Sequence, residues 1–466
     1  MSNPLVTMDL HPMPGAGTAR PWEFPVPQHS VLASGLKVQR CNRPGQQVVA
    51  VEICLDAPLD AEPDGLDGIA TIMVHALSEG CGPYSAEEFA AELERCGATV
   101  GSRVDYTGAR ISMEVPVSRL ARALALLTEA LRTPTFAASE VERLVRNRLD
   151  EIPHELASPP RRAAKQLAAE LFPASSRMSR PREGSEDTVA RIDSAGVRAL
   201  YDAHMRPGTA TAVIVGDLTG IDLDRMLADT LGGWTNPVAP PVSVPRAAAD
   251  DTGRVVIVDR PGAVQTQLLV GRTGPDRRDP VWPALVVGTY CLGGTLTSRL
   301  DRVLREEKGY TYGVRAFAQV LRSPAATADG ATGTSLLAIS GAVDTASTAP
   351  ALADMQSVLR TLAADGLTGA ERDLAVQNLV LVAPLRYETA AAVAGTLADQ
   401  VEQHLPDDYQ AQLYKRIAAT STAAATEAVV SAFPAASLVT VLVGDANQIR
   451  EPVESLGIGD VSVVAS

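Results

Sequence analysis

The sequence predicts an α+β protein made of two homologous halves, each a mainly antiparallel sheet covered by helices. The chain of 466 residues is too long for one ordinary hydrophobic core. Residues 209–227 (TATAVIVGDLTGIDLDRML) read as a β-branched strand, a Gly-Asp turn and a helix, and residues 437–456 (SLVTVLVGDANQIREPVESL) repeat that order. Between the repeats, the proline-dense stretch TNPVAPPVSVPRAAADDTG reads as a semi-extended linker.

Further paired segments support this division. A helix is expected before each repeated strand, at 192–205 and 420–433, and each half opens with a strand, QVVAVEICLDAP at 47–58 and TQLLVGRTGP at 266–275. We therefore expect four regions: an N-terminal extension over 1–30, a first half over 31–234, a linker over 235–253 and a second half over 254–466.

Composition and charge exclude several classes of protein. A net charge of −14 argues against a nucleic-acid binder, which needs a basic surface. The chain has no apolar run of about eighteen residues, so we expect no membrane span. Its N-terminus lacks the basic and apolar regions of a secretory signal. The five cysteines show no C-x-x-C spacing, which favours a reduced, cytoplasmic setting without a disulfide or zinc framework.

Four helices of the first half are predicted from capping residues and apolar patterns. PYSAEEFAAELERCG has Ser85 as N-cap and Gly97 as stop, and residues 118–134 have one strongly apolar face. A third helix begins with a capping-box pattern, Ser139 followed by Glu142. The stretch GIATIMVHALSE, residues 68–79, is almost wholly apolar and is expected to be a buried helix that contains one histidine, His75.

In the second half, SRLDRVLREEKGYTYGVRAFAQV at 298–320 predicts an amphipathic helix that ends at Gly309. A strand is expected next, with Tyr310, Tyr312, Val314 and Ala316 on one face. The reversal at Gly309 would bring Arg305 near Tyr312. On the residues alone, an arginine at a helix C-terminus and a cross-strand tyrosine are the ordinary interpretation.

The order of elements and several motifs resemble the family of pitrilysin, insulin-degrading enzyme and mitochondrial processing peptidase. The resemblance covers nearly the whole chain after residue 30. The segments that carry it are Asp67-Gly68, RTPTF, LFPASSRMSRPREGSEDTVARI, MRPGTATAVIVGD, GGW at 232–234, VDRPGAVQTQ at 258–267 and GGTLTSRLDRVLREEKGYTYGV at 293–314.

The resemblance implies a zinc helix that has lost its chemistry. Catalytic members carry His-x-x-Glu-His, in which two imidazoles one helical turn apart bind zinc and the glutamate is the general base. The matching positions here are Thr71, Val74 and His75, and Glu151 falls where a third ligand would stand. We expect no metal or cofactor in this chain, and we expect His75 to be a buried histidine satisfied by a neighbour such as Glu151.

The resemblance also gives the Arg305–Tyr312 pair a function. In the family, an Arg and a Tyr at this spacing bind the substrate backbone and stabilise the oxyanion that develops at the zinc of another half. The chain is therefore expected to be a non-catalytic subunit of a clamshell-forming heterodimer, with a His-x-x-Glu-His partner that carries zinc and a peptide as substrate. The edge-strand region GATVGSRVDYTGARISMEVP lacks the substrate-handling residues of many active relatives. Two alternatives remain: a structural subunit without proteolysis, and a homodimeric peptide-binding protein.

Overall fold

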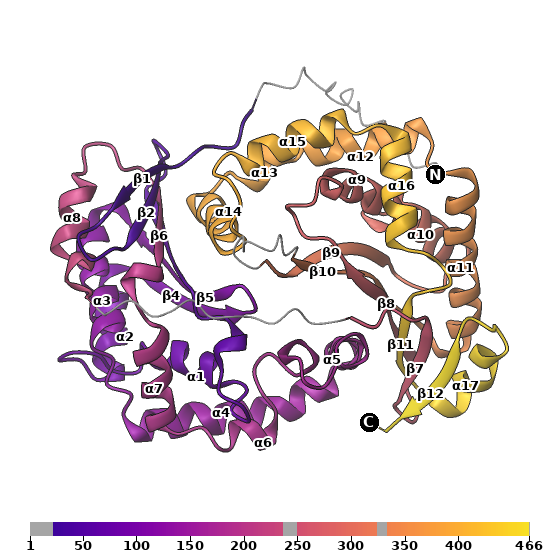
Figure 1. Cartoon of the computed structure of the whole chain (residues 1–466), viewed down its shortest axis with the longest axis horizontal. Coiled ribbons are helices and arrows are strands. Elements are labelled where there is room, and N and C mark those ends of the chain that lie inside the picture. The colour runs from indigo at the N-terminus through magenta and orange to yellow at the C-terminus, as the bar shows by residue number, and fades with distance from the viewer. Residues whose placement is uncertain (1–21, 236–248, 324–332, 466) are drawn as a thin grey trace, which may run out of the picture.

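The computed structural model describes residues 22–235, 249–323 and 333–465. The described chain forms two six-stranded sheets, one in each half, with helices packed around them (Figure 1). Each sheet is mainly antiparallel, as predicted, although both contain parallel pairs.

The first half contains the sheet β1-β2-β6-β3-β5-β4. Its strands are β1 (Gln28–Val31), β2 (Lys37–Asn42), β3 (Val48–Leu55), β4 (Thr99–Asp105), β5 (Gly108–Pro116) and β6 (Thr211–Gly216). Its α-helices are α1 (Ile69–Ala76), α2 (Ala86–Cys96), α3 (Leu120–Arg132), α4 (Ala138–Ala157), α5 (Pro159–Leu171), α6 (Glu186–Val189), α7 (Ser194–His204) and α8 (Leu223–Asp229). Short 3₁₀ turns are η1 (Leu59–Ala61), η2 (Val117–Arg119), η3 (Arg177–Ser179), η4 (Pro207–Thr209) and η5 (Leu231–Gly233).

The second half contains the sheet β12-β7-β11-β8-β10-β9. Its strands are β7 (Arg254–Asp259), β8 (Gln265–Gly274), β9 (Val314–Arg322), β10 (Thr334–Asp344), β11 (Val439–Gly444) and β12 (Asp460–Val464). Its helices are α9 (Trp282–Gly293), α10 (Arg299–Asp301), η6 (Arg302–Glu307), η7 (Thr345–Ser347), α11 (Thr348–Asp365), α12 (Gly369–Leu381), α13 (Ala383–Arg386), α14 (Ala390–Glu402), α15 (Tyr409–Ala419), α16 (Thr422–Ala432) and α17 (Ala446–Glu454).

The two sheets have the same topology, which agrees with the repeat seen in the sequence. Matching β2 to β6 with β7 to β11 superposes the two strand orders. The predicted strand–turn–helix units are β6 with α8 and β11 with α17. The outermost strands differ, because β1 precedes β2 and runs antiparallel to it, whereas β12 comes from the end of the chain and runs parallel to β7.

One helix of each half packs on the sheet of the other half. Helix α5 packs on β8 and β11 of the second sheet, and α14 packs on β3 and β6 of the first (Figure 1). The side chains at these contacts are apolar: Leu167 of α5 shares a buried cluster with Val441, and Leu397 of α14 shares one with Val213. The exchange covers sheet faces that would otherwise expose apolar side chains to water.

A buried ionic cluster crosses the contact between α14 and the first sheet. Arg110 of β5 donates from Nε to Glu402 at 2.7 Å and from Nη2 to Asp399 at 2.8 Å, and Arg103 of β4 donates to Glu402 at 2.9 Å. Burial raises the pKa of Glu402 to about 7, while the guanidinium of Arg110 opposes the rise. The halves are therefore joined by paired charges as well as by apolar contacts.

Two helix starts test the capping predictions. Helix α2 begins as expected, with a full capping box between Ser85 and Glu88, and ends at the left-handed Gly97. The capping box expected at Ser139 is wrong. Helix α4 begins at Ala138 with Ala137 as its N-cap, so Ser139 already lies in the first turn.

The ends of the predicted regions differ slightly from the structure. Strand β1 starts at Gln28, so the predicted boundary of the extension at residue 30 falls inside a strand. Trp22 stacks on Tyr387 of the second half with ring centroids 5.5 Å apart. Strand β7 begins at Arg254, and most of the expected linker, residues 236–248, lies outside the described residues.

Two other sequence expectations concern cysteines and membrane spans. All five cysteines are buried and free. Within the described ranges, no helix combines the length and the apolar character that a membrane crossing requires.

Candidate functional site

Helix α1, which carries the zinc-motif positions, is fixed at its N-terminus by a carboxylate. Glu62 accepts hydrogen bonds from the backbone nitrogens of Gly68 at 2.9 Å and Ala70 at 3.0 Å, which suits the positive end of a helix. Gly68 has φ of 99°, and a Cβ there would lie 2.6 Å from a backbone oxygen of Glu183. Only glycine fits this position. Asp67, just before it, accepts from Arg180 at 2.6 Å.

The side chains of α1 fill the core, except at one position. Thr71 is 8% exposed and Val74 is 2% exposed, so both act as packing residues. His75 is exposed, and the expectation of a buried histidine satisfied by Glu151 is wrong. The other residues of α1 are buried, and the His75 side chain is the one that faces away from the core. Glu151 instead accepts from Arg148 at 3.3 Å, and its side chain is 63% exposed.

A cavity of about 440 Å³ lies beside α1, and we call it the α1 cavity. Its walls come from α1, α2, α3, α4 and the edge strand β4. They include His75, Glu79, Arg143, Asn147, Phe89, Val100, Gly101, Ser102, Ile111 and Leu127. Arg143 donates to Glu79 at 2.5 Å. Glu151 is not among the lining residues, whereas Asn147, one helical turn earlier on α4, is.

The residues at the α1 cavity do not fit a zinc ion. Zinc sites use imidazole, thiolate or carboxylate ligands, usually three or four of them. Thr71 and Val74 are buried and supply none, which leaves His75 alone on the helix. Across the residues that the structure describes, no group of three His, Cys, Asp or Glu side chains is arranged to hold a metal ion.

The predicted helix before Gly309 is present but irregular. After the short α10, residues 302–307 form a π-helical turn, η6, and the backbone nitrogen of Lys308 donates to Val303 at 3.1 Å. Gly309 ends it in the left-handed region, with φ of 67°, as predicted. Such π turns occur frequently at functional sites. Nothing in the sequence indicated this one.

The strand expected after Gly309 starts later than predicted. Strand β9 begins at Val314, so Tyr310 and Tyr312 lie in a turn before it and not on a strand face. The hydroxyl of Thr311 accepts from the backbone nitrogen of Gly313 at 3.1 Å, which stabilises a local turn in place of strand pairing. Asp301 then accepts from the nitrogen of Val314 at 3.1 Å and fixes the first strand residue.

Arg305 and Tyr312 both lie at the surface. Tyr312 is 94% exposed, and the Arg305 side chain is 34% exposed and forms an ion pair with Glu306. Among the described residues, no hydrogen bond joins Arg305 to Tyr312. Tyr312 is not a cross-strand tyrosine, because it does not lie on a strand.

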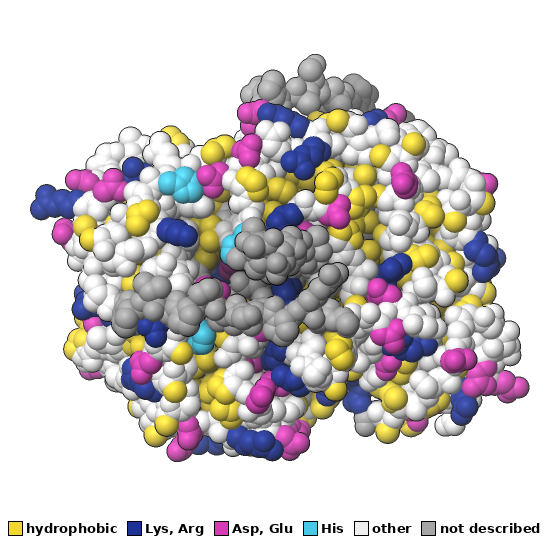
Figure 2. Space-filling view, viewed as in Figure 1, with side chains coloured by type: hydrophobic (Ala, Val, Ile, Leu, Met, Phe, Trp, Pro, Cys, Tyr) yellow, Lys and Arg dark blue, Asp and Glu magenta, His cyan; other side chains and the backbone are white. Residues whose placement is uncertain are grey.

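Charges on the surface shown in Figure 2 are mixed. Lys and Arg side chains alternate with Asp and Glu side chains, and no continuous basic area covers this face.

Comparisons with known proteins identify similar chains. A family model described as Insulinase (Peptidase family M16) matches residues 37–179, and one described as Peptidase M16 inactive domain matches residues 191–379. A protein of Mycobacterium tuberculosis named an uncharacterized zinc protease is 25% identical over 375 residues, which cover 79% of this chain and 82% of that protein. One of Bacillus subtilis with the same description is 20% identical and covers 72% of this chain and 79% of its own length.

Solved structures share the fold. A Pseudomonas fluorescens protein described as a peptidase M16 inactive domain has a TM-score of 0.80 at 22% identity and covers 90% of this chain and 98% of its own. A protease from Helicobacter pylori has a TM-score of 0.79 at 18% identity and covers 90% and 100%. The periplasmic protease PqqL of Escherichia coli has a TM-score of 0.75 at 15% identity and covers 96% of this chain and 52% of its own.

Proposed function

Because the chain belongs to peptidase family M16, the insulinase family, we propose that it is a non-catalytic, substrate-binding subunit of a heterodimeric zinc metallopeptidase. Zinc and the general base reside in a homologous partner subunit that carries His-x-x-Glu-His. This chain contributes Arg305 and Tyr312 to the partner's site. The complex hydrolyses peptide bonds in the cytoplasm.

The observation that carries this proposal is the contrast between α1 and the turn after η6. On α1, the positions of the missing ligand and base hold buried Thr71 and Val74, which can neither bind zinc nor move a proton. After η6, a phenol is 94% exposed although the turn has no structural need for it. A large aromatic side chain that is exposed to water and has no hydrogen bond or ion pair to any described residue favours a role toward another molecule.

The chemistry of the two side chains suits the task. A guanidinium stays charged at any physiological pH, and a phenol donates one directional hydrogen bond. Aimed at the oxygen of a scissile carbonyl, the two donors stabilise the negative charge that develops there. To bind the substrate, Arg305 gives up its ion pair with Glu306. The loss costs little free energy, because surface ion pairs contribute little to stability.

The test is reconstitution. The chain is purified alone, mixed with a zinc-motif partner subunit, and assayed for cleavage of a fluorogenic peptide. Native mass spectrometry of the mixture reports stoichiometry and zinc together. We expect a one-to-one complex that holds one zinc ion and cleaves peptide, and no cleavage by this chain alone.

Other outcomes separate the alternatives. A stable complex whose activity equals that of the partner alone would favour a structural subunit without proteolysis. A homodimer that binds peptide without cleavage would favour a peptide-binding protein. Zinc-dependent cleavage by the purified chain alone would contradict the proposal.

A further inference from the structure

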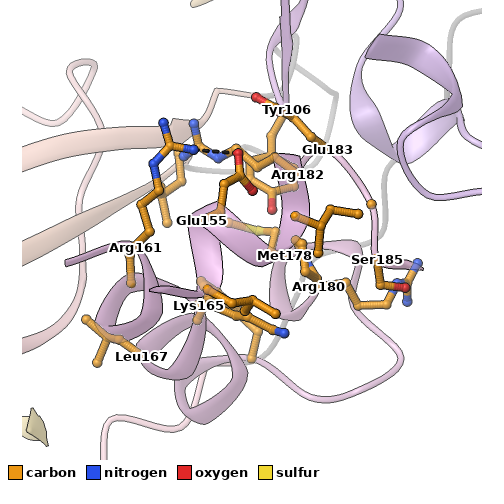
Figure 3. Close-up of a pocket in the computed structure, with 18 of the residues that line it drawn as sticks. Tyr106, Glu155, Arg161, Lys165, Leu167, Met178, Arg180, Arg182, Glu183 and Ser185 are labelled. Atoms are coloured by element: carbon orange, nitrogen blue, oxygen red, sulfur yellow. Dashed lines mark hydrogen bonds and ion pairs between the residues drawn. The ribbon is translucent and has the colours of Figure 1, made fainter. Parts of the chain in front are cut away.

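A large cavity lies between the two halves, and we call it the apolar cavity. It has a volume of about 660 Å³, and its floor is built from side chains of α4, α5, β9 and β10 (Figure 3). The apolar lining residues are Ile152, Leu156, Leu167, Leu171, Phe172, Met178, Leu321 and Leu336. A floor of this kind suits one or two aliphatic side chains of a ligand.

Most charged groups around the apolar cavity are already paired. Glu155 accepts from Arg148 at 2.8 Å and from Arg161 at 2.5 Å, and Arg180 donates to Asp67. Glu183 forms an ion pair with Arg148 at 3.3 Å, while Lys165, Glu186 and Asp187 lie exposed at the rim. The paired charges leave the floor itself neutral.

A second, polar cavity of about 280 Å³ adjoins the first, because Arg182, Gln319 and Leu321 line both. It too lies between the halves. Its other walls are Arg103, Asp105, Thr107, Arg277, Trp282, Ala318, Val320, Asp399, Glu402 and Gln403. Together the two cavities give an apolar space that ends in a polar one.

The three carboxylates of the polar cavity are satisfied from within the protein. Asp105 accepts a hydrogen bond from Arg103 at 2.7 Å. Asp399 and Glu402 accept the hydrogen bonds from Arg110 and Arg103 that are described above. Two arginines remain without a carboxylate among the described residues. Arg182 lies 5.3 Å above the ring of Tyr106, and Arg277 has no described side-chain partner. The uncompensated charge in the polar cavity is therefore positive.

The polar cavity also contains a buried acceptor without a donor. Gln403 is 9% exposed, and its Oε1 has no hydrogen-bond partner among the described residues. A buried amide oxygen without a partner is destabilising. A ligand that brings an N–H group to this point would remove that cost.

We propose that the two cavities bind the carboxyl-terminal end of an apolar peptide. The terminal carboxylate pairs with Arg182 and Arg277, as carboxylates do with guanidinium groups. The last amide N–H donates to Oε1 of Gln403. The aliphatic side chains occupy the apolar cavity beyond Arg182. Because both halves line the site, the bound peptide bridges them.

The probe is a hexapeptide, Gly-Ser-Gly-Ala-Leu-Leu, with fluorescein on its amino terminus, titrated with the full chain and followed by fluorescence anisotropy. Two matched peptides test its two ends: the carboxyl-terminal amide, and Gly-Ser-Gly-Ala-Ser-Ser with a free carboxylate. Each is expected to bind about tenfold more weakly than the probe, because one loses a charge-assisted contact and the other loses its apolar contact. No partner subunit and no cleavage enter this assay, so its failure would leave the proposed role of Arg305 untouched.

Variants locate the binding. Arg277→Met and Arg182→Met are each expected to weaken the free acid about tenfold and to leave the amide unchanged. Gln403→Met removes the acceptor at similar volume and is expected to weaken both peptides about threefold. Arg450→Met, an exposed arginine paired with Glu454 on α17, is the matched control and should change nothing. Thermal unfolding of each variant verifies that it is folded.

Three results would overturn the proposal. The first is no binding of the free acid by the folded wild-type chain. The second is equal binding of acid and amide. The third is unchanged affinity in both arginine variants. Competition by free leucine as strong as that by the hexapeptide would equally overturn the assignment of the apolar cavity to side chains.

Discussion

The two halves have one topology but differ at the places where chemistry is expected. In the first half, Thr71 and Val74 of α1 are buried and His75 is exposed, and the α1 cavity is lined by Val74 and His75 but not by Thr71. In the second half, the π turn η6 and the turn after it keep Arg305 and Tyr312 at the surface. Two of the three predicted zinc-motif positions are therefore packed in the core, whereas the predicted Arg-Tyr pair lies at the surface, because each set lies on its own local structure.

The two halves are alike in one respect: each sheet has a face that is covered by a helix from the other half. Helix α14 covers the first sheet and α5 covers the second. The first half also has a structural role in joining the halves, because it supplies Arg110 and Arg103 to the buried cluster with α14. The predictions below test this division, beginning with the largest effect.

Arg110→Met should cause the largest loss of stability, about 3 kcal/mol of unfolding free energy, because it leaves Glu402 and Asp399 without their buried partner. Protonation of Glu402, whose pKa burial raises to about 7, limits the loss. Urea unfolding measures it. Arg103→Met is the control, with a side chain that is 45% exposed, and should cost less than about 1 kcal/mol. Equal losses in the two variants would contradict a buried ionic contact between the halves.

Val74→Glu should destabilise the chain by about 2 kcal/mol, because it places a carboxylate in the core at the position of the missing base. The matched control on the same helix is His75→Glu, which introduces the same side chain at an exposed position and should change stability by less than about 0.5 kcal/mol. Thermal or urea unfolding compares them. If both variants behaved alike, α1 would not be a packing helix at residue 74.

Helix α12 of the second half also begins with a capping box, between Thr368 and Glu371, and its stability contribution should depend on pH differently from that of the box at α2. Hydrogen bonds from Arg299 lower the pKa of Glu371 to about 2 from 4.5, whereas Glu88 lacks such an arginine. A lowered pKa means that the contribution of Glu371 is present above about pH 4.5 and is lost as the pH falls toward 2. The stability difference between wild type and Glu371→Gln should shrink over that range. Because Glu371 is partly exposed, its full contribution should stay below about 1 kcal/mol.

For Glu88→Gln, the same measurement should give a smaller pH-dependent difference. Glu88 is exposed, and hydrogen bonds from the backbone nitrogen and the hydroxyl of Ser85 lower its pKa. A larger pH-dependent effect from Glu88 than from Glu371 would contradict the role assigned to Arg299.

Tyr312→Phe should leave stability unchanged, within about 0.5 kcal/mol, because the hydroxyl is exposed and has no described partner. Differential scanning calorimetry is sufficient to show this. A loss above about 1 kcal/mol would mean that the phenol serves the fold of this chain, and the interpretation of Tyr312 as a group directed at another molecule would fail.

Much of the fold was predictable because it rests on local signals. The β-branched runs, the Gly-Asp turns and the Ser85 cap predicted β6, β11 and α2 with nearly the observed bounds. The exchange of α5 and α14 was not predictable, since amphipathic helices do not indicate which sheet they cover. The start of β9 was missed because a local turn at Thr311 competes with strand pairing, which alternation alone does not reveal.

The candidate site was predictable only in part. The absence of ligands at Thr71 and Val74 followed from the sequence, but the exposure of His75 and the presence of Asn147 in the α1 cavity depend on how α1 and α4 pack. The π turn that presents Arg305 has no sequence signature that we can identify. The role of Arg305 and Tyr312 in trans stays a prediction.

The central claim is that this chain completes a partner's active site through Arg305, and one measurement tests it most directly. In the reconstituted complex, kcat is measured for wild type, Arg305→Ala and Arg302→Ala; Arg302 is the matched control three residues earlier on η6, with a side chain that is 59% exposed. Arg305→Ala should lower kcat about 100-fold without loss of complex or zinc, as removal of an oxyanion donor does, and Arg302→Ala should not. Equal kcat for Arg305→Ala and wild type would contradict the account.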